Sequence, residues 1–247
     1  MTGELLAQDQ MPLAVVTGAA RRIGRSIALH LASRGYAIGL HYHKSRAEAE
    51  ITASEVSQTG VPVYLLPADL TRPGEINAMF TEVDKIPSPL ELLVNSAALM
   101  QPSDLSTLDV ESWDELFNLN TRALWLCSRE AAARMKPGGL ILNISDVGAK
   151  KNWTRYGGYV VSKAAVEALT RVMARQLAPE VRVCAIAPGL LIRAEGQSIQ
   201  EWERLIEKVP LKSPADVGEF FEVMDFLIGN RYITGEVIGF SGGSQLL

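Results

Sequence analysis

Short apolar runs alternate along the chain with longer stretches whose apolar residues recur at helical spacing. Runs this short and this apolar are typical of strands that are buried on both faces, as in a parallel sheet. The predicted strands are Leu13–Thr17, Ala37–Tyr42, Val63–Ala68, Leu90–Asn95, Gly139–Ser145, Val181–Ala187 and Glu236–Phe240. The predicted helices are Ile23–Arg34, Arg46–Ser57, Glu75–Lys85, Val110–Met135, Tyr159–Leu177 and Ala215–Ile228.

This alternation of strands and helices predicts an α/β fold. We expect a single-domain Rossmann fold, in which helices cover both faces of a doubly wound, seven-stranded parallel sheet. The chain has 247 residues, 47% of them hydrophobic, which is enough for one large core. Residues 1–11 are predicted to form a flexible tail and residues 12–247 the catalytic domain. Within that domain, the segment at about 190–213 is predicted to be a substrate lid that carries Trp202 and Leu205.

Composition and charge exclude several classes of protein. The net charge is -4 and no basic block is present, which argues against a nucleic-acid partner. The two cysteines, Cys127 and Cys184, are too few and too far apart for a disulfide framework or a zinc site, and they read as small buried hydrophobes. No apolar run reaches the roughly 20 residues of a membrane span, and no secretion signal is recognised. We therefore expect a cytoplasmic protein without a metal.

The first predicted strand leads through Thr17 and Gly18 directly into a helix. The free N–H groups and the partial positive charge of a helix N-terminus favour a pyrophosphate at such a turn. Gly24 would allow close packing of the helix. An ordinary tight turn is the alternative, but the position in the first strand-to-helix connection favours a dinucleotide site.

The end of the second predicted strand indicates which dinucleotide is bound. NAD sites place an acidic residue there to hold the ribose 2′-hydroxyl, whereas this chain has His41, Tyr42, His43, Lys44 and Ser45. Charge and hydrogen bonds from Arg21, His43, Lys44 and Ser45 suit a 2′-phosphate, which predicts NADP(H). The residues expected around this end of the cofactor are Arg21, His41, Tyr42, His43, Lys44 and Ser45, with Asp69 and Leu70 near the adenine.

The segment "YVVSK" places Tyr159 and Lys163 four residues apart on a predicted helix, so that both point the same way. An unperturbed phenol is a weak acid with a pKa near ~10. A neighbouring ammonium is expected to stabilise the phenolate and to lower that pKa. The pair would then donate a proton to a carbonyl or an imine that accepts hydride.

These motifs together resemble the short-chain dehydrogenase/reductase family. The matching pieces are "TGAARRIG", "ADL", "LVNSAA", "NLNT", "NIS", the Tyr159/Lys163 pair, "APG" and "YITGEVI". The resemblance implies reduction of a carbonyl or imine with NADP(H), with Tyr159 as the acid, Lys163 on the nicotinamide ribose and Asn120 holding a water in the proton path. It also places Gly18, Ile23, Gly24, Asn95, Ser96, Ala97, Pro188 and Gly189 against the cofactor.

Two departures from the family pattern resemble its pteridine reductase branch. Arg22 stands where the family usually has glycine, and Asp146 stands where it usually has serine. The resemblance implies that Arg22 reaches from the pyrophosphate toward a pterin, that Asp146 assists proton delivery, and that Tyr156 lines the pocket. Alternatively, Asp146 only caps the end of a strand and Arg22 only neutralises phosphate.

One further departure leaves the substrate open. That branch carries an aromatic residue where this chain has Met100, and Ala98 replaces a hydrogen-bonding serine. Met100 can pack on a flat ring through its polarizable sulfur. Trp153 is a second candidate for the missing ring face, unless it only packs the edge of a loop. The predicted substrate-binding residues are Arg22, Met100, Asp146, Trp153, Tyr156, Tyr159 and Leu190.

The sequence thus predicts an NADPH-dependent reductase that transfers hydride to a C=N bond of a pterin, of the dihydropterin or folate type. The alternative is a carbonyl reductase acting on a 3-oxoacyl thioester or a small ketone, and a non-catalytic NADP-binding sensor is a third reading. The apolar helices Val110–Met135 and Tyr159–Leu177 form subunit contacts in the family, so we expect a homotetramer, with a dimer second.

Overall fold

The computed structural model describes residues 11–151, 153–193 and 196–246 of the chain, so most of the predicted tail lies outside the described residues. Each predicted strand is present, with its bounds shifted by no more than one residue. The strands are β1 (Leu13–Val16), β2 (Ala37–Tyr42), β3 (Val63–Pro67), β4 (Leu90–Asn95), β5 (Gly139–Ile144), β6 (Val181–Pro188) and β7 (Val237–Phe240).

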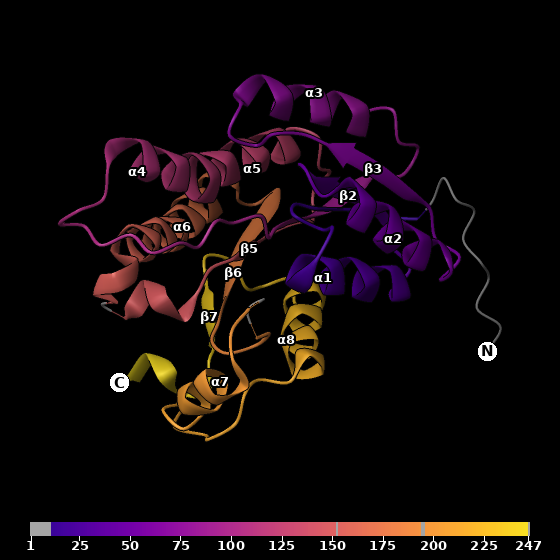
Figure 1. Ribbon diagram of the computed structural model, residues 1–247. Helices are drawn as coiled ribbons and strands as arrows, with labels where there is room; N and C mark the ends of the chain where they lie inside the picture. Colours follow the sequence, from indigo (N-terminus) through magenta and orange to yellow (C-terminus); the bar gives the residue numbers. More distant parts are fainter. Residues whose placement is uncertain (1–10, 152, 194–195, 247) are drawn as a thin grey trace.

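Helices connect these strands along the chain (Figure 1). They are α1 (Arg22–Ser33), α2 (Arg46–Ser57), α3 (Pro73–Val83), α4 (Val110–Phe117), α5 (Leu124–Ala132), α6 (Gly157–Leu177), α7 (Ile199–Ile206) and α8 (Val217–Gly229). A π-helical segment, Asn118–Ala123, separates α4 from α5, and the 3₁₀ turns Val147–Lys150 and Thr154–Tyr156 precede α6. No helix of the described ranges is long and apolar enough to span a lipid bilayer.

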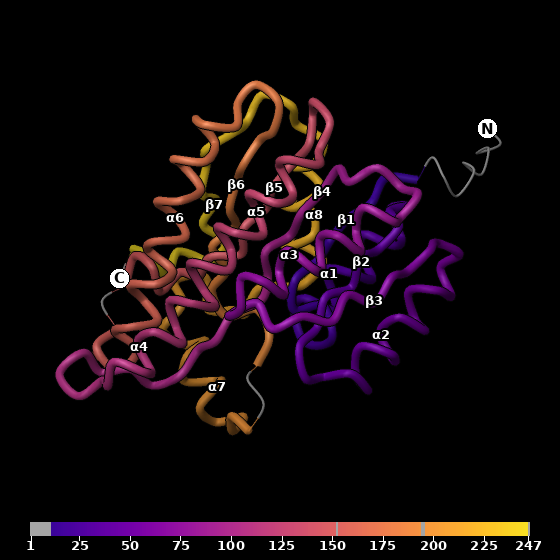
Figure 2. The backbone as a smooth tube through the Cα atoms, turned by 90° about the horizontal axis from the view of Figure 1, so that it is seen from above, coloured from indigo at the N-terminus to yellow at the C-terminus, as the bar shows by residue number. Residues whose placement is uncertain are grey.

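The seven strands form one parallel sheet in the order β3-β2-β1-β4-β5-β6-β7, which Figure 2 shows across the molecule. The single-domain, doubly wound Rossmann fold predicted from the sequence is confirmed. The order of connection reverses between β1 and β4. In such sheets ligands bind outside the carboxyl ends of the strands at this reversal, so the topology alone places a site beside the loops that follow β1 and β4.

Helices cover both faces of the sheet. On one face α1 and α8 are joined by His30, whose Nε2 lies 2.8 Å from Oδ1 of Asp225 and whose ring stacks on Phe221. The helices α3, α5 and α6 lie on the opposite face (Figure 1). Strands β1, β2 and β5 are buried along their whole length, which explains why they read as continuous apolar runs.

The prediction of one helix over Val110–Met135 is wrong in two respects. The helix is interrupted by the π-helical segment and ends at Ala132. Asn120, in the π-helical segment, bonds to the backbone of the loop after β4, with its Oδ1 accepting from Leu99 N at 2.7 Å and its Nδ2 donating to Leu99 O at 2.9 Å. A π-helical turn adds a residue without removing the apolar periodicity, so the pattern along the chain does not reveal it.

Candidate active site

The turn after β1 has the backbone geometry that a close approach to a ligand requires. Gly18 has a φ of +66°, and a Cβ there would lie 2.9 Å from Cα of Ala97. A Cβ on Gly24 would lie 2.2 Å from the carbonyl oxygen of Gly18. Both glycines are therefore fixed by packing, and they bring the N-terminus of α1 against the loop that follows β4.

His41, which was predicted to be one of the cofactor-binding residues, supports this turn through both nitrogens of its ring. Its Nδ1 accepts a hydrogen bond from Gly18 N at 3.0 Å, and its Nε2 lies 3.1 Å from the carbonyl oxygen of Ala68. Burial lowers the pKa of His41 to about 4. The imidazole is therefore neutral at physiological pH and both ring nitrogens are engaged within the protein, so we assign His41 to the architecture of the turn.

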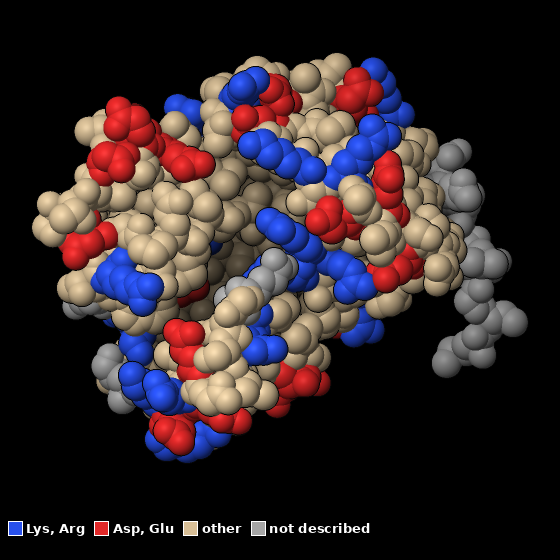
Figure 3. Space-filling view, viewed as in Figure 1, with Lys and Arg blue, Asp and Glu red and all other residues tan. Residues whose placement is uncertain are grey.

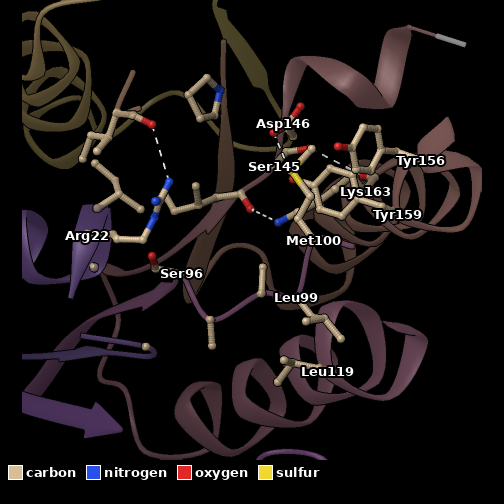
Figure 4. Close-up of a pocket in the computed structure, with 18 of the residues that line it drawn as sticks. Arg22, Ser96, Leu99, Met100, Leu119, Ser145, Asp146, Tyr156, Tyr159 and Lys163 are labelled. Atoms are coloured by element: carbon tan, nitrogen blue, oxygen red, sulfur yellow. Dashed lines mark hydrogen bonds between the residues drawn. The ribbon is translucent and has the colours of Figure 1, made fainter. Parts of the chain in front are cut away.

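Arg22 adopts a left-handed backbone conformation, with a φ of +54° at the start of α1. Glycine meets this requirement without strain, which explains why glycine usually occupies the position. The guanidinium extends across the cavity mouth, with Nη1 3.5 Å from the carbonyl oxygen of Arg193 and Nη2 3.5 Å from that of Ile192 (Figure 4). Arg22 thus bridges the turn after β1 and the segment after β6.

The cavity end beyond β2 carries cations and no acidic residue at the strand end itself. Arg21, His43, Lys44 and Ser45 all line it. The nearest acidic group follows β3: Asp69 Oδ2 lies 3.9 Å from Nε2 of His43, and its Oδ1 accepts from the backbone and hydroxyl of Thr71. This charge arrangement fits a 2′-phosphate, as predicted.

The loop after β4 is fixed by Thr17, which the sequence analysis did not assign to the site. The Thr17 hydroxyl oxygen accepts from Ser96 N at 3.0 Å and from Ala97 N at 3.1 Å. The Ser96 Oγ is buried, lines the cavity and has no hydrogen-bond partner among the residues that the structure describes. An unpartnered donor at this wall fits a polar ligand such as a dinucleotide.

Two of the predicted residues stand behind the cavity wall. Asn95 is buried and donates from Nδ2 to Ser128 Oγ and to Asn143 Oδ1, at 2.9 Å each. Asn120 uses its side chain on Leu99 and, at 3.0 Å, on Ser162 Oγ. Neither side chain is among those that line the cavity, so both act by holding the loops that do. The water-holding role implied for Asn120 therefore does not fall to its side-chain amide.

The predicted catalytic group lies at the carboxyl end of β5 and the start of α6. Tyr159 Oη donates to Oδ2 of Asp146 at 2.9 Å, and Lys163 Nζ donates to the carbonyl oxygen of Ile144 at 2.8 Å. The Lys163 ammonium lies 5.9 Å from the centre of the Tyr159 ring. Asp146 Oδ1 also accepts from Gly148 N at 2.6 Å, so Asp146 is both a cap and a partner of Tyr159.

The expected lowering of the Tyr159 pKa is wrong for this arrangement. Burial, followed by the charge of Asp146 and its hydrogen bond, raises the pKa of Tyr159 well above 10.0. Burial lowers the pKa of Lys163 to about 8, against an opposing effect of Asp146, and burial raises the pKa of Asp146. Burial is the largest cause, and the charge of Asp146 acts in the same direction, so the pKa of Tyr159 is raised where the sequence predicted a lowered one. Tyr159 therefore keeps its proton at neutral pH and can act as a donor.

The predicted catalytic group opens into a cavity of about 1670 Å³. Arg22 enters this space from α1, opposite Tyr156, Tyr159 and Asp146 (Figure 4). The volume exceeds the 300–1,000 Å³ of a usual ligand pocket, as expected for a cofactor and a substrate together. The predicted site residues that line it are Gly18, Arg21, Arg22, Ile23, Gly24, His41, Tyr42, His43, Lys44, Ser45, Asp69, Leu70, Ser96, Ala97, Met100, Asp146, Trp153, Tyr156, Tyr159, Lys163, Pro188, Gly189 and Leu190.

The substrate end of the cavity contains the residues that departed from the family pattern. Met100 is 50% exposed, and Leu99 and Leu119 lie near it (Figure 4). Trp153 packs its ring against Gly148, where a Cβ would lie 2.8 Å from Trp153 Cζ3. The Trp153 ring therefore packs against a turn, as one interpretation predicted, and also lines the cavity, where the other interpretation placed it.

The predicted lid contains helix α7, which begins at a cap in which Ser198 Oγ accepts from Glu201 N. Trp202 and Leu205 lie on α7 and line the cavity, as expected from their spacing. Residues 194 and 195 of this segment lie outside the described residues.

Comparison with known proteins agrees with this geometry. The family model described as enoyl-(acyl carrier protein) reductase matches residues 18–245. An NADPH-dependent aldehyde reductase of Arabidopsis thaliana is 36% identical, over 95% of this chain and 94% of its own length. The 3-oxoacyl-(acyl-carrier-protein) reductase FabG of Staphylococcus aureus is 32% identical, over 94% and 98%. The solved structure of FolM alternative dihydrofolate reductase 1 from Brucella canis, complexed with NADP, superposes with a TM-score of 0.90 at 32% identity, covering 98% of this chain and 97% of that one.

A Rossmann sheet with a Tyr-Lys pair beside its switch point defines a dinucleotide-dependent oxidoreductase. The chain belongs to the short-chain dehydrogenase/reductase family, and its cofactor is NADP(H). The site fits that cofactor in three ways. The glycine turn leaves room at the N-terminus of α1, the buried hydroxyl of Ser96 has no partner among the described residues, and basic side chains line the cavity beyond the end of β2.

Proposed function

We propose that this protein reduces a C=N bond of a dihydropterin or folate-type pterin with NADPH. The observation that carries the proposal is the 2.9 Å hydrogen bond between Tyr159 and Asp146, at a position where the family usually has serine. A serine would serve a ketone as a second hydroxyl donor. A carboxylate instead suits the amino and ring N–H groups of a pterin, which are donors.

The side chains take the following roles in this proposal. The bound reduced nicotinamide supplies the hydride. Tyr159 Oη gives its proton to the substrate nitrogen. Asp146, whose pKa is raised by burial, then takes a proton from solvent and passes it to the tyrosinate. Lys163 holds the nicotinamide ribose. Arg22, which spans the mouth, contacts both cofactor phosphate and the heterocycle.

The similarity to FolM, which is described as an alternative dihydrofolate reductase, supports a pterin substrate. The residues proposed to contact the pterin are Arg22, Met100, Asp146, Trp153, Tyr156, Tyr159 and Leu190.

A second candidate is the reduction of a carbonyl compound, such as an aldehyde or a 3-oxoacyl thioester. Half-exposed Met100 and the methyl group of Ala98 favour it, because neither provides a flat aromatic face or a hydroxyl for a pterin. The similarity to an aldehyde reductase and to FabG supports the same candidate.

A side-by-side assay of NADPH oxidation separates these candidates. The substrates are 7,8-dihydrobiopterin, 7,8-dihydrofolate, acetoacetyl-CoA and a small aldehyde. We expect the highest kcat/KM with a pterin. A kcat/KM at least tenfold higher for a carbonyl substrate would establish the second candidate. Tight NADPH binding without turnover of any of the four would indicate the sensor.

We also propose that the enzyme is a homotetramer. Four large apolar side chains are exposed on the helices that were predicted to form subunit contacts: Val110 on α4, Trp125 on α5, and Val161 and Val172 on α6. Light scattering coupled to size exclusion tests this, and a monomeric mass would overturn it. The cytoplasmic location stays a prediction from the sequence.

A further inference from the structure

The segment that joins Asp146 to Tyr159 carries two cations that the catalytic group does not use. Lys151 and Arg155 belong to this short stretch, and both line the cavity together with Trp153 and Tyr156. The chain therefore passes from one catalytic residue to the other by way of a wall with aromatic and basic side chains.

This wall is held in place by backbone hydrogen bonds. Lys151 N donates to the carbonyl oxygen of Gly148 at 2.9 Å, and the carbonyl oxygen of Arg155 accepts from Ser103 N at 2.8 Å. The guanidinium of Arg155 lies 5.6 Å from the centre of the Tyr156 ring. Stacking of this kind orients the guanidinium and leaves its N–H donors available for an anion.

Neither cation forms a salt bridge with any residue in the ranges that the structure describes. Some basic residues elsewhere in the chain are neutralised by acidic partners: Arg46 lies 2.8 Å from Glu50, and Arg134 contacts both Asp84 and Glu130. A wall of unpaired cations beside a substrate cavity offers charge to an incoming anion.

The neighbouring wall has the opposite charge. Glu111, Asp114 and Glu115 of α4 line the same cavity. Figure 3 shows an acidic patch over α4 and a basic patch over the 3₁₀ turns, on adjacent borders of the hollow. An anionic group on a substrate is repelled by α4 and attracted to the turns, so the two walls fix the side on which it lies.

We propose that Lys151 and Arg155 form an anion subsite for the tail of the substrate, and that this anion is the carboxylate of a folate-type side chain. The assignment to a folate rests on the proposed function, whereas the cationic wall does not. The subsite would make the enzyme favour a pterin with an anionic tail over one with a short neutral tail.

The test compares two matched substrate pairs in the wild type and in the double variant Lys151→Ala/Arg155→Ala. The first pair is 7,8-dihydrofolate and 7,8-dihydrobiopterin, and the second is acetoacetyl-CoA and uncharged acetoacetyl-N-acetylcysteamine. The measured quantity is the ratio of kcat/KM within each pair, at low and at high salt. The matched control is Lys150→Ala, which removes a neighbouring exposed lysine that does not line the cavity.

We expect the dihydrofolate to dihydrobiopterin ratio to fall about tenfold in the double variant, as the loss of two charge-assisted contacts predicts. High salt should lower the same ratio in the wild type, and Lys150→Ala should keep the wild-type ratio. An unchanged ratio in an enzyme that reduces both pterins overturns the subsite and leaves the proposed function intact. If the wild type reduces neither pterin, the proposed function fails. In that case, a lower kcat/KM ratio for the thioester pair alone in the double variant would assign the wall to the phosphates of CoA and overturn the folate carboxylate. If the ratio for the thioester pair is also unchanged, the subsite itself is overturned.

Discussion

The hydroxyl of Tyr159 donates a hydrogen bond to Oδ2 of Asp146, and the two atoms lie 2.9 Å apart. The phenol comes from α6 and the carboxylate from the end of β5, thirteen positions earlier in the chain. This contact sets the protonation of the site, because the carboxylate and burial together hold the proton on Tyr159.

Replacing Tyr159 by phenylalanine should remove the proton donor and keep the shape of the site. General acid catalysis typically contributes 10²–10⁴-fold, so we expect kcat to fall by about that factor. The dissociation constant for NADPH, measured by fluorescence titration, should change by less than about threefold. A variant with a normal kcat would disprove the assignment of the acid.

Replacing Asp146 by serine restores the residue that the family usually carries. We expect kcat/KM for dihydrobiopterin to fall at least tenfold, because the N–H donors of the pterin lose the carboxylate that accepts their hydrogen bonds. Activity toward a small aldehyde should be kept, since a serine hydroxyl can donate to a carbonyl oxygen. Equal losses on both substrates would show that Asp146 does not select the pterin.

The pH dependence of kcat/KM for NADPH should show an alkaline limb near pH 8. The ammonium of Lys163, whose pKa burial lowers to about 8, is present below that pH and is lost above it. Tyr159 keeps its proton over the same range. Because Asp146 raises the pKa of Lys163, Asp146→Ser should move this limb to lower pH. An alkaline limb that stays in place in the variant would contradict the coupling.

Replacing Arg22 by glycine should stabilise the folded protein and at the same time weaken the binding of NADPH. Glycine relieves the left-handed φ of +54°, so we expect the free energy of unfolding to rise by about 1 kcal/mol. The KM for NADPH should rise severalfold, because a guanidinium is lost from the cavity mouth. Urea unfolding and steady-state kinetics on the same preparation measure the two effects, and Arg22→Lys serves as the control that keeps the charge and the strain.

His41 should make the fold sensitive to acid. The pKa of His41 is about 4 in the folded protein, whereas an unperturbed histidine, as in the unfolded chain, has a pKa of 6.5. Between pH 4 and pH 6.5 the unfolded chain therefore binds more protons than the folded protein. Stability is then lost as the pH falls from about 6.5 to 4, by up to about 1.4 kcal/mol per pH unit. Urea unfolding of the wild type and His41→Asn at pH 7 and pH 5 measures this. Parallel losses in the two proteins would show that other groups carry the acid sensitivity.

The sequence by itself determined the features that depend on local spacing. Apolar runs defined the seven strands of the sheet, the turn at Gly18 marked one wall of the cavity, and the interval of four residues placed Tyr159 and Lys163 on one side of α6. These predictions succeeded because the strand and helix periods are properties of neighbouring residues.

Tertiary structure alone decided which groups meet. The two partners of His41 lie 23 and 27 residues away in the chain, and its spacing does not reveal that both ring nitrogens are used to support the turn. Asn120 holds a loop 21 residues earlier, and the helix around it widens to do so. The sign of the Tyr159 pKa shift likewise follows from burial and from a carboxylate on another element. Burial and charge act through space, and no spacing along the chain encodes them.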